Sequence, residues 1–179
     1  MANHGSIEAI AKKTGNINVI IETPKGSANK YKFDEETKLF KLSKSMPAGA
    51  VFPFDFGFIP STLAPDGDPL DILVLMDEPV FVGCLMDVRL LGVIEAQQKP
   101  KGEKTRRNDR LIGVFAKSKN YGEYKSIFDL SNNFLSEVEH FFISYHRISG
   151  NIFRPIKRDG PAAAKRLVQE SMRRFSEKR

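Results

Sequence analysis

The run LDILVL at residues 70–75 is a stretch of apolar residues interrupted by one carboxylate, Asp71. A continuous apolar run of this length is typical of a strand that is buried on both faces. Because side chains alternate along a strand, Asp71 is expected on the same face as Leu73 and Leu75. A carboxylate on a buried face needs a partner, since an unpaired buried charge is too costly to keep. The run therefore predicts a buried strand that carries a paired acidic group.

Two more carboxylates, Asp66 and Asp68, precede this strand in the segment PDGDPLD at residues 65–71. The proline and glycine suit a type I turn, so a solvated turn is the alternative explanation for these two residues. Like charges about 5 Å apart repel by roughly 3 kcal/mol near a protein surface, and a bound cation would offset this repulsion. An EF-hand loop does not fit, because its fifth and sixth positions, which need an oxygen ligand and glycine, would be Leu70 and Asp71. We therefore expect a metal site of another kind.

The chain has 179 residues, of which 41% are hydrophobic and 28% are charged. This size and balance favour a single folded domain over residues 1–179 and argue against a disordered or membrane-embedded chain. The first residues lack the charged-then-apolar pattern of a signal peptide, and the one cysteine, Cys84, fits a reducing compartment. We therefore expect a cytoplasmic protein. The formal net charge of +6 suggests a polyanionic partner.

Periodicity indicates a short opening helix, then many short strands, and then two helices. Strands are expected at residues 17–23, 30–33, 39–42, 70–75, 80–93 with a break at Gly83, and 111–116, and helices at 6–13 with Ser6 as cap, 131–146 and 161–175. Phenylalanine recurs at every second position from Phe52 to Phe58, which predicts another strand with one aromatic face. We therefore predict an α+β protein, in which a small closed β-barrel has helices packed on its outside.

The sequence DGDPLD at residues 66–71 matches the signature of the soluble family I inorganic pyrophosphatases, with three acidic positions, a glycine and a proline at fixed spacing ahead of an apolar strand. The likeness extends from VIIETP at residue 19 to FFISYH at residue 141. The chain therefore resembles a divergent member of that family. The resemblance implies an OB-like barrel that uses several Mg²⁺ ions, with Mn²⁺ or another divalent ion as an alternative, to hydrolyse diphosphate to two phosphates.

This chemistry needs clustered acids beside clustered bases. Diphosphate is highly anionic, so Mg²⁺ ions held by carboxylates neutralise its oxygens and acidify a water, while basic side chains stabilise the leaving phosphate. The resemblance implies catalytic roles for Asp68, Asp71 and Tyr145, with Asp68 helping to deprotonate the attacking water. It also implies substrate contacts from Lys30, Lys44, Arg110, Tyr145 and His146, and metal contacts from Asp66, Asp68, Asp71, Glu22, Glu103 and Asn108.

Several positions depart from the pattern of this family. Lys32 stands where the family commonly has an acidic residue, Lys44 where it has arginine, Phe56 where it has tyrosine, Asn108 where it has aspartate, and His146 where it has lysine. Asp109 could replace Asn108 as a metal ligand if the loop shifts by one residue, although period two would point its side chain away. Because fewer carboxylates should weaken binding of the outer metals, we expect a greater Mg²⁺ requirement than in members with the full set.

Two other functions are compatible with the sequence. The departures allow a weakened relative that binds diphosphate or a nucleotide without efficient hydrolysis. The basic segment at residues 99–110 and the alternating phenylalanines also allow a barrel that binds single-stranded nucleic acid. Three carboxylates would repel phosphates without metal, so nucleic acid is the less favoured partner. The resemblance further implies a homo-oligomer, with a hexamer favoured, and activity on a larger phosphoanhydride stays open.

Overall fold

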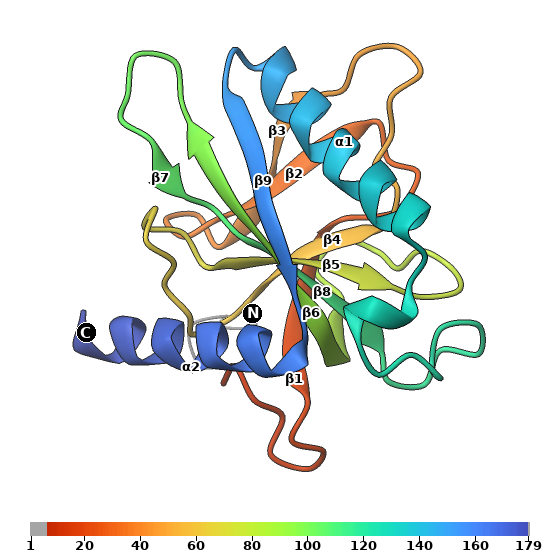
Figure 1. Cartoon of the computed structure of the whole chain (residues 1–179). Coiled ribbons are helices and arrows are strands. Elements are labelled where there is room, and N and C mark those ends of the chain that lie inside the picture. Colours follow the sequence, from red (N-terminus) through yellow and green to blue (C-terminus); the bar gives the residue numbers. More distant parts are fainter. Residues whose placement is uncertain (1–6, 179) are drawn as a thin grey trace.

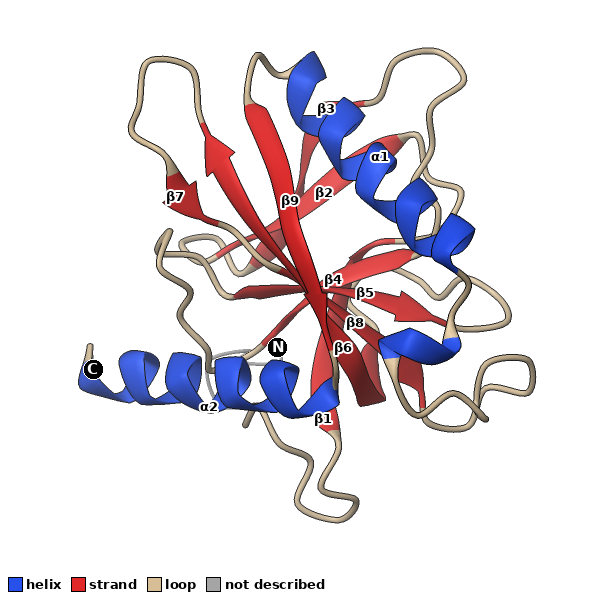
Figure 2. Ribbon diagram, in the orientation of Figure 1, coloured by secondary structure: helices blue, strands red, loops and turns tan. Residues whose placement is uncertain are grey.

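The computed structural model describes residues 7–178, and strand β6 (Leu85–Lys99) is the longest element of its main sheet. The other elements are β1 (Ile17–Thr23), β2 (Asn29–Asp34), β3 (Leu39–Ser45), β4 (Asp55–Ile59), β5 (Leu70–Leu75), β7 (Arg106–Arg107), β8 (Arg110–Phe115), the 3₁₀ helix η2 (Ile127–Asp129), α1 (Asn132–Ile148), β9 (Ile152–Asp159) and α2 (Pro161–Glu177). Figure 1 shows their arrangement along the chain, and Figure 2 separates helices from strands.

The pairings of five strands close into a ring. β1 pairs with β4, β4 with β5, β5 with β8, β8 with β6, and β6 returns to β1. β5 and β8 run parallel, whereas the other neighbours in the ring are antiparallel. β7 and β9 pair with β6 outside the ring, and β2 and β3 form a separate hairpin. The predicted small closed barrel is therefore confirmed.

Side chains along the barrel strands alternate between two apolar clusters. On β5, Ile72 and Val74 belong to the cluster that packs against α2, whereas Leu73 and Leu75 belong to the cluster that packs against α1. Asp71 lines the cleft together with Phe142 and Tyr145 of α1, so it lies on the α1 side of the barrel, on the face predicted for it with Leu73 and Leu75. The helices lie outside the ring (Figure 1), with α1 against β9 and α2 against β6. Within residues 7–178, no helix is long and apolar enough to cross a membrane.

The helix predicted at residues 6–13 is wrong in its described part. Ile10 forms an antiparallel bridge with Ile17, and the Ala11 amide donates a hydrogen bond to the Asn16 carbonyl at 2.8 Å. Gly15, at a φ of 72°, closes the turn between them. Pairing with the start of β1 therefore overrides a helical pattern that is too short to be stable alone. The expected cap, Ser6, lies outside the described residues.

The aromatic strand is shorter than predicted. β4 begins only at Asp55, because Pro53 has no amide hydrogen to donate and the backbone of Phe52 pairs instead with the turn at residues 26–27, at 2.8 and 3.1 Å. Phe52, Phe56 and Phe58 nevertheless line the same cleft, so the prediction of one aromatic face holds for these three residues. The chain therefore enters the barrel with these phenylalanine rings toward the cleft.

Strand β9 was not predicted from the sequence. It contains Pro155 and several charged residues, and among the described strands it pairs with β6 alone. Proline is tolerated on an edge strand, where one side of the backbone has no ladder to join. β9 also contributes Phe153 to the cluster beneath α1, so this unpredicted strand forms part of the support for the site.

Candidate active site

A cleft of about 740 Å³ opens between the β2–β3 hairpin, the barrel and α1. Most of the site residues predicted from the sequence line it, namely Glu22, Lys30, Asp66, Asp68, Asp71, Asn108, Arg110, Tyr145 and His146. Two predicted residues do not. Lys44 packs its ammonium on the ring of Tyr145, and Glu103 lies on an exposed loop with Arg106 as its ion-pair partner at 3.7 Å. The fold therefore gathers residues from β1 through α1 into one concave surface.

Glu22 at the end of β1 and Lys30 at the start of β2 form a buried ion pair in this cleft. The Lys30 ammonium donates to Glu22 Oε2 at 2.9 Å, and the Phe33 amide donates to Glu22 Oε1 at 2.8 Å. The ammonium also lies 4.4 Å from the ring centre of Phe56, where an aromatic face stabilises a cation. Both oxygens of Glu22 are thus engaged, and the carboxylate fixes the position of the lysine.

Arg110 at the start of β8 is a second buried cation, with 4% of its side chain exposed. It donates to Asp71 Oδ2 at 2.6 Å, to Asn108 Oδ1, and to His146 Nε2 at 3.3 Å. Its guanidinium carbon lies 5.2 Å and 5.4 Å from the centres of two phenylalanine rings, one on α1 and one on β9. Asp71 therefore has the partner that a carboxylate on a buried strand requires, and this partner is Arg110.

The two residues before Arg110 face in different directions. Asn108 lines the cleft and donates a hydrogen bond from its side-chain amide to Gln98. Asp109 is buried and accepts hydrogen bonds from the Ala96 amide, at 3.0 Å, and from the Arg107 side chain. Period two predicts this orientation. The register that the structure adopts thus has Asn108, and not Asp109, on the cleft side.

Asp66 and Asp68 lie in the turn before β5. Asp66 Oδ1 accepts a hydrogen bond from the Asp68 amide at 3.2 Å, and the Lys32 ammonium donates to Asp68 Oδ2 at 3.0 Å. Burial raises the pKa of Asp66 above its usual range, and the charges of Asp71 and Asp68 raise it further. The three carboxylates therefore still repel one another, although two of them hold basic side chains.

The chemistry of these donors fits Mg²⁺. Hard carboxylate oxygens are the ligands that Mg²⁺ prefers, and a divalent cation would relieve the repulsion from Asp71 and Asp68 that, after burial, raises the pKa of Asp66. In the described part of the chain, no three histidine, cysteine or acidic side chains are already grouped around a common point. Lys32 and Arg110 occupy Asp68 and Asp71 instead. A metal at these carboxylates would have to compete with the chain's own cations.

Tyr145 on α1 lines the cleft, and its ring contacts the Lys44 ammonium. Burial, followed by the nearby charge of Asp71, raises the pKa of Tyr145 to about 12, so its hydroxyl keeps its proton near neutral pH. The Lys44 ammonium lies 3.7 Å from the centre of the tyrosine ring and donates to Ser149 Oγ at 2.7 Å. Tyr145 can therefore donate a hydrogen bond into the cleft, while Lys44 contributes positive charge at its ring.

His146 is buried at the end of α1, with 6% of its surface exposed. Its ring stacks on Phe153, with ring centres 4.9 Å apart. Because arginine can only donate, Nε2 is the unprotonated nitrogen and accepts from Arg110. Burial, together with the charges of Arg110 and Lys44, lowers the pKa of His146 to about 3. The neutral ring positions Arg110, and the predicted contact of His146 with the substrate stays a prediction.

Through His146, the wild type is expected to lose about 2 kcal/mol of its free energy of unfolding between about pH 7.5 and pH 5. The variant His146→Gln should be spared this loss. In the unfolded chain, His146 takes up a proton near its ordinary pKa of 6.5, whereas the folded ring stays neutral down to about pH 3. The unfolded state therefore binds more protons as the pH falls, and acidification destabilises the fold. Urea unfolding at both pH values measures the difference.

The matched control is His140→Gln, because His140 is an exposed histidine on the same helix. This variant should keep the pH dependence of the wild type. If His146→Gln and the wild type lose the same free energy of unfolding on acidification, the neutral, buried state of His146 is contradicted.

The sequence did not identify every residue of the cleft wall. Gln98 on β6 and Arg106 on β7 line it, and the tip of the β2–β3 hairpin contributes Asp34, Glu35 and Glu36. Gln98 on β6 and Arg106 on β7 lie opposite each other in the strand pairing. The loop between them has no sequence pattern that predicts this pairing. Lys32 could have been placed from its period-two spacing to Lys30, since both line the cleft from the same strand.

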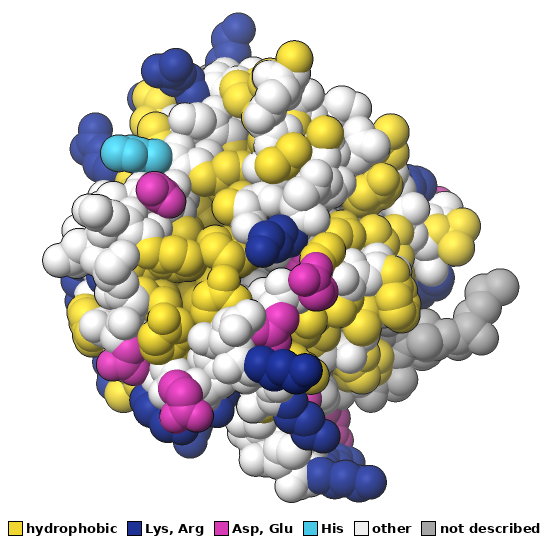
Figure 3. All heavy atoms as spheres, turned by 90° about the vertical axis from the view of Figure 1, so that its right-hand side faces the viewer, with side chains coloured by type: hydrophobic (Ala, Val, Ile, Leu, Met, Phe, Trp, Pro, Cys, Tyr) yellow, Lys and Arg dark blue, Asp and Glu magenta, His cyan; other side chains and the backbone are white. Residues whose placement is uncertain are grey.

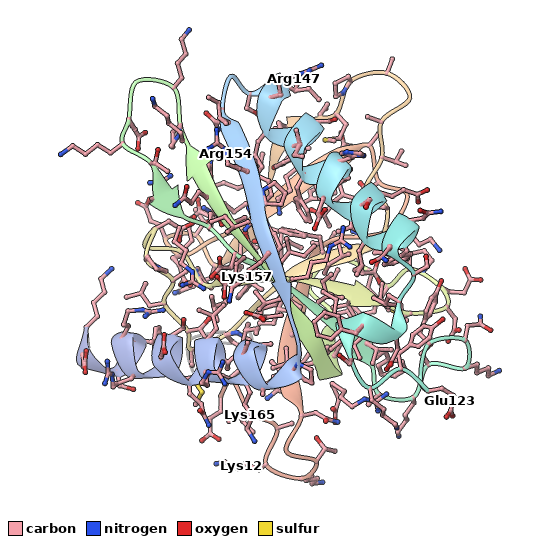
Figure 4. All side chains as sticks on the ribbon, in the orientation of Figure 1. Lys12, Glu123, Arg147, Arg154, Lys157 and Lys165 are labelled. Atoms are coloured by element: carbon pink, nitrogen blue, oxygen red, sulfur yellow. The ribbon has the colours of Figure 1, made fainter. Side chains whose placement is uncertain are left out.

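Basic side chains outside the cleft are mixed with acidic ones. Figure 3 shows lysine, arginine, aspartate and glutamate interspersed on one face of the molecule. Arg147 lies at the end of α1, and Arg154 and Lys157 lie along β9 (Figure 4). None of these three lines the cleft, and Lys157 pairs with Asp159 at 2.7 Å. On the face that Figure 3 shows, the described side chains do not form the continuous basic stripe typical of a nucleic-acid interface.

A barrel that brings three aspartates and several basic side chains into one cleft is typical of hydrolases that act on phosphate compounds. The family model for inorganic pyrophosphatase matches residues 19–176. The chain therefore belongs to the inorganic pyrophosphatase family.

Individual relatives agree with this assignment. The chain is 39% identical to the inorganic pyrophosphatase of Synechocystis sp., over 91% of this chain and 94% of the relative, and 37% identical to that of Geobacillus stearothermophilus, over 91% and 96%. The solved structure of the inorganic pyrophosphatase from Thermus thermophilus superposes with a TM-score of 0.88 at 32% identity, over 98% of this chain and 99% of that one. The resemblance and the OB-like fold predicted from the sequence are confirmed, and neither alternative function gains support.

Proposed function

We propose that this chain hydrolyses inorganic diphosphate to two phosphates, with Mg²⁺ as its cofactor. The observation that carries the proposal is the convergence of Asp66, Asp68 and Asp71 with the buried cations Lys30 and Arg110 in one cleft. Carboxylates suit the metal, and the cations suit an anion of high charge. Mn²⁺ or another divalent ion is an alternative cofactor, because the donors are oxygens.

Asp66, Asp68 and Asp71 would hold the metal ions, with Asn108 adding a neutral amide oxygen. When bound, Mg²⁺ supplies positive charge to the phosphate oxygens and lowers the pKa of water. Asp68 is the proposed base, because its carboxylate is more than half exposed to the cleft and can accept a proton from the attacking water. Glu22 orients Lys30, and the predicted metal contacts of Glu22 and Glu103 stay predictions.

The basic side chains of the cleft wall would stabilise the negative charge of the phosphates. Arg110 is fixed by Asp71, Asn108 and His146, so its guanidinium is held in place before the substrate arrives. Lys30 is held by Glu22 in the same way. The Tyr145 hydroxyl would donate a hydrogen bond to a phosphate oxygen, and Lys44 would add positive charge next to the tyrosine ring.

Phosphate release from diphosphate, measured with Mg²⁺ and with a chelator, tests the proposed function. We expect rapid release with Mg²⁺ and none with the chelator. Because Lys32 and Asn108 leave fewer carboxylates for the outer metals, the rate should saturate only in the millimolar range of Mg²⁺. Saturation at low micromolar Mg²⁺ would contradict the metal requirement, and no release at any Mg²⁺ concentration would contradict the function itself.

We also propose a homo-oligomer in the cytoplasm, with a hexamer favoured. Ile148, Ile152 and Ile156 are large apolar side chains that are more than half exposed around the end of α1 and along β9. A second copy of the chain would cover such side chains. A monomeric mass by light scattering would contradict the oligomer. The single cysteine supports the proposed location, which cell fractionation would test.

A further inference from the structure

Lys32 extends from the β2–β3 hairpin into the mouth of the cleft. It follows Lys30 by two positions on β2, and both side chains line the cleft. Its ammonium lies 3.0 Å from Asp68 Oδ2. Burial alone would lower the pKa of Lys32, but the hydrogen bond with Asp68 and the charges of Glu22 and Asp71 raise it above its usual value. The side chain is therefore a stable cation that faces the acidic cluster of the site.

The ion pair of Lys32 differs from the other ion pairs beside the aspartates. Arg110 is 4% exposed and Lys30 is 10% exposed, so each is locked among several partners. The side chains of Lys32 and Asp68 are 55% and 57% exposed, and within residues 7–178 Asp68 is the one carboxylate to which Lys32 donates a hydrogen bond. An exposed pair of this kind contributes little to stability and separates easily.

We propose that Lys32 is a substrate-binding residue. When a divalent cation binds the carboxylate of Asp68, the Lys32 ammonium leaves Asp68 and binds a phosphate oxygen of diphosphate instead. This inference rests on the proposed function of the cleft. A metal ion at Asp68 would repel the ammonium, and the flexible lysine stem allows the ammonium to move. The nearest anion that enters the cleft is the substrate, and its charge gives the ammonium a new partner.

The exchange has a consequence for the metal ions. Seven carboxylates and five lysine or arginine side chains line the cleft, so its net charge is slightly negative before anything binds. Lys32 supplies a positive charge that is covalently attached, whereas an acidic residue at this position would instead attract a further metal ion. The variant Lys32→Glu should therefore bind Mg²⁺ more tightly than the wild type in the absence of substrate, and it should bind a diphosphate analogue more weakly when no metal is present.

Calorimetric titration of the full chain with methylene diphosphonate, a diphosphate analogue with a non-hydrolysable bridge, tests the proposal. In Mg²⁺, Lys32→Met is expected to raise the Kd about tenfold, as for loss of one hydrogen bond to a charged group. The matched control is Lys38→Met, because Lys38 lies at the tip of the same hairpin, pairs with Glu35 and does not line the cleft. This control should bind the analogue as the wild type does.

A Kd of Lys32→Met equal to that of the wild type in Mg²⁺ would overturn the proposal, and so would an equal rise in Kd for Lys38→Met. Titration of Mg²⁺ alone into Lys32→Glu gives a second readout that does not depend on activity, and an affinity no tighter than that of the wild type would also count against the exchange. Phosphate release is measured separately on the wild type. A wild type that binds the analogue but releases no phosphate would contradict the proposed function, while the Kd values would still decide the role of Lys32.

Discussion

Asp68→Asn is expected to lower the rate of phosphate release by about 10³-fold at saturating Mg²⁺ and diphosphate, because the proposed base is lost. An asparagine keeps the shape of the side chain but cannot accept the proton of the attacking water. The fold should not change, since the carboxylate is 57% exposed and its ion pair with Lys32 is of the weak surface kind. Steady-state assays, together with a thermal unfolding curve, measure both quantities.

The control for this variant is Glu36→Gln, which also removes one negative charge from the lining of the cleft. Glu36 lies at the tip of the hairpin rather than beside Asp66 and Asp71, so its loss should change the rate by less than about threefold. Comparable losses in both variants would mean that the net charge of the cleft, rather than a base at Asp68, determines the rate. An Asp68→Asn enzyme with nearly full activity would assign the base to another group.

The barrel was predictable because its evidence is local in the sequence. The apolar run at 70–75 has the length and pattern of a buried strand, and β5 occupies those six residues. β9 was missed because its pattern mixes isoleucines, charged residues and Pro155, and its pairing depends on the distant strand β6. The predicted N-terminal helix failed for the same kind of reason, since a bridge between Ile10 and Ile17 replaces it.

The site was predictable in its acidic half and less so in its basic half. Asp66, Asp68 and Asp71 occur within one short segment, so their spacing alone indicates a shared role. Their partners Lys32 and Arg110 lie 36 and 39 positions away in the sequence, on a separate hairpin and on another strand of the barrel. No periodicity links such positions, and only the packing of the strands decides which cation meets which carboxylate.

Arg110→Met is expected to lower the free energy of unfolding by about 3 kcal/mol and the rate of phosphate release by about 10²-fold. The stability falls because the variant leaves Asp71 beside an apolar wall without its cation. About 3 kcal/mol is the lower end of the range for breaking a buried pair, because Asp71 is 29% exposed and keeps some hydration. The rate falls because the positioned guanidinium no longer stabilises charge on the phosphate. Urea unfolding and steady-state assays measure the two effects.

Arg106→Met is the control, because Arg106 is another arginine of the cleft wall but is 41% exposed, and its ion pair with Glu103 is long, at 3.7 Å. Its stability should stay within about 1 kcal/mol of the wild type. Asp71→Asn in the Arg110→Met background separates the two causes of instability. If the stranded carboxylate is responsible, the double variant recovers part of the lost stability, since the uncompensated charge is gone. If it recovers none, the loss comes from the cavity between the two phenylalanine rings, and the ion pair is not what requires an arginine at this position.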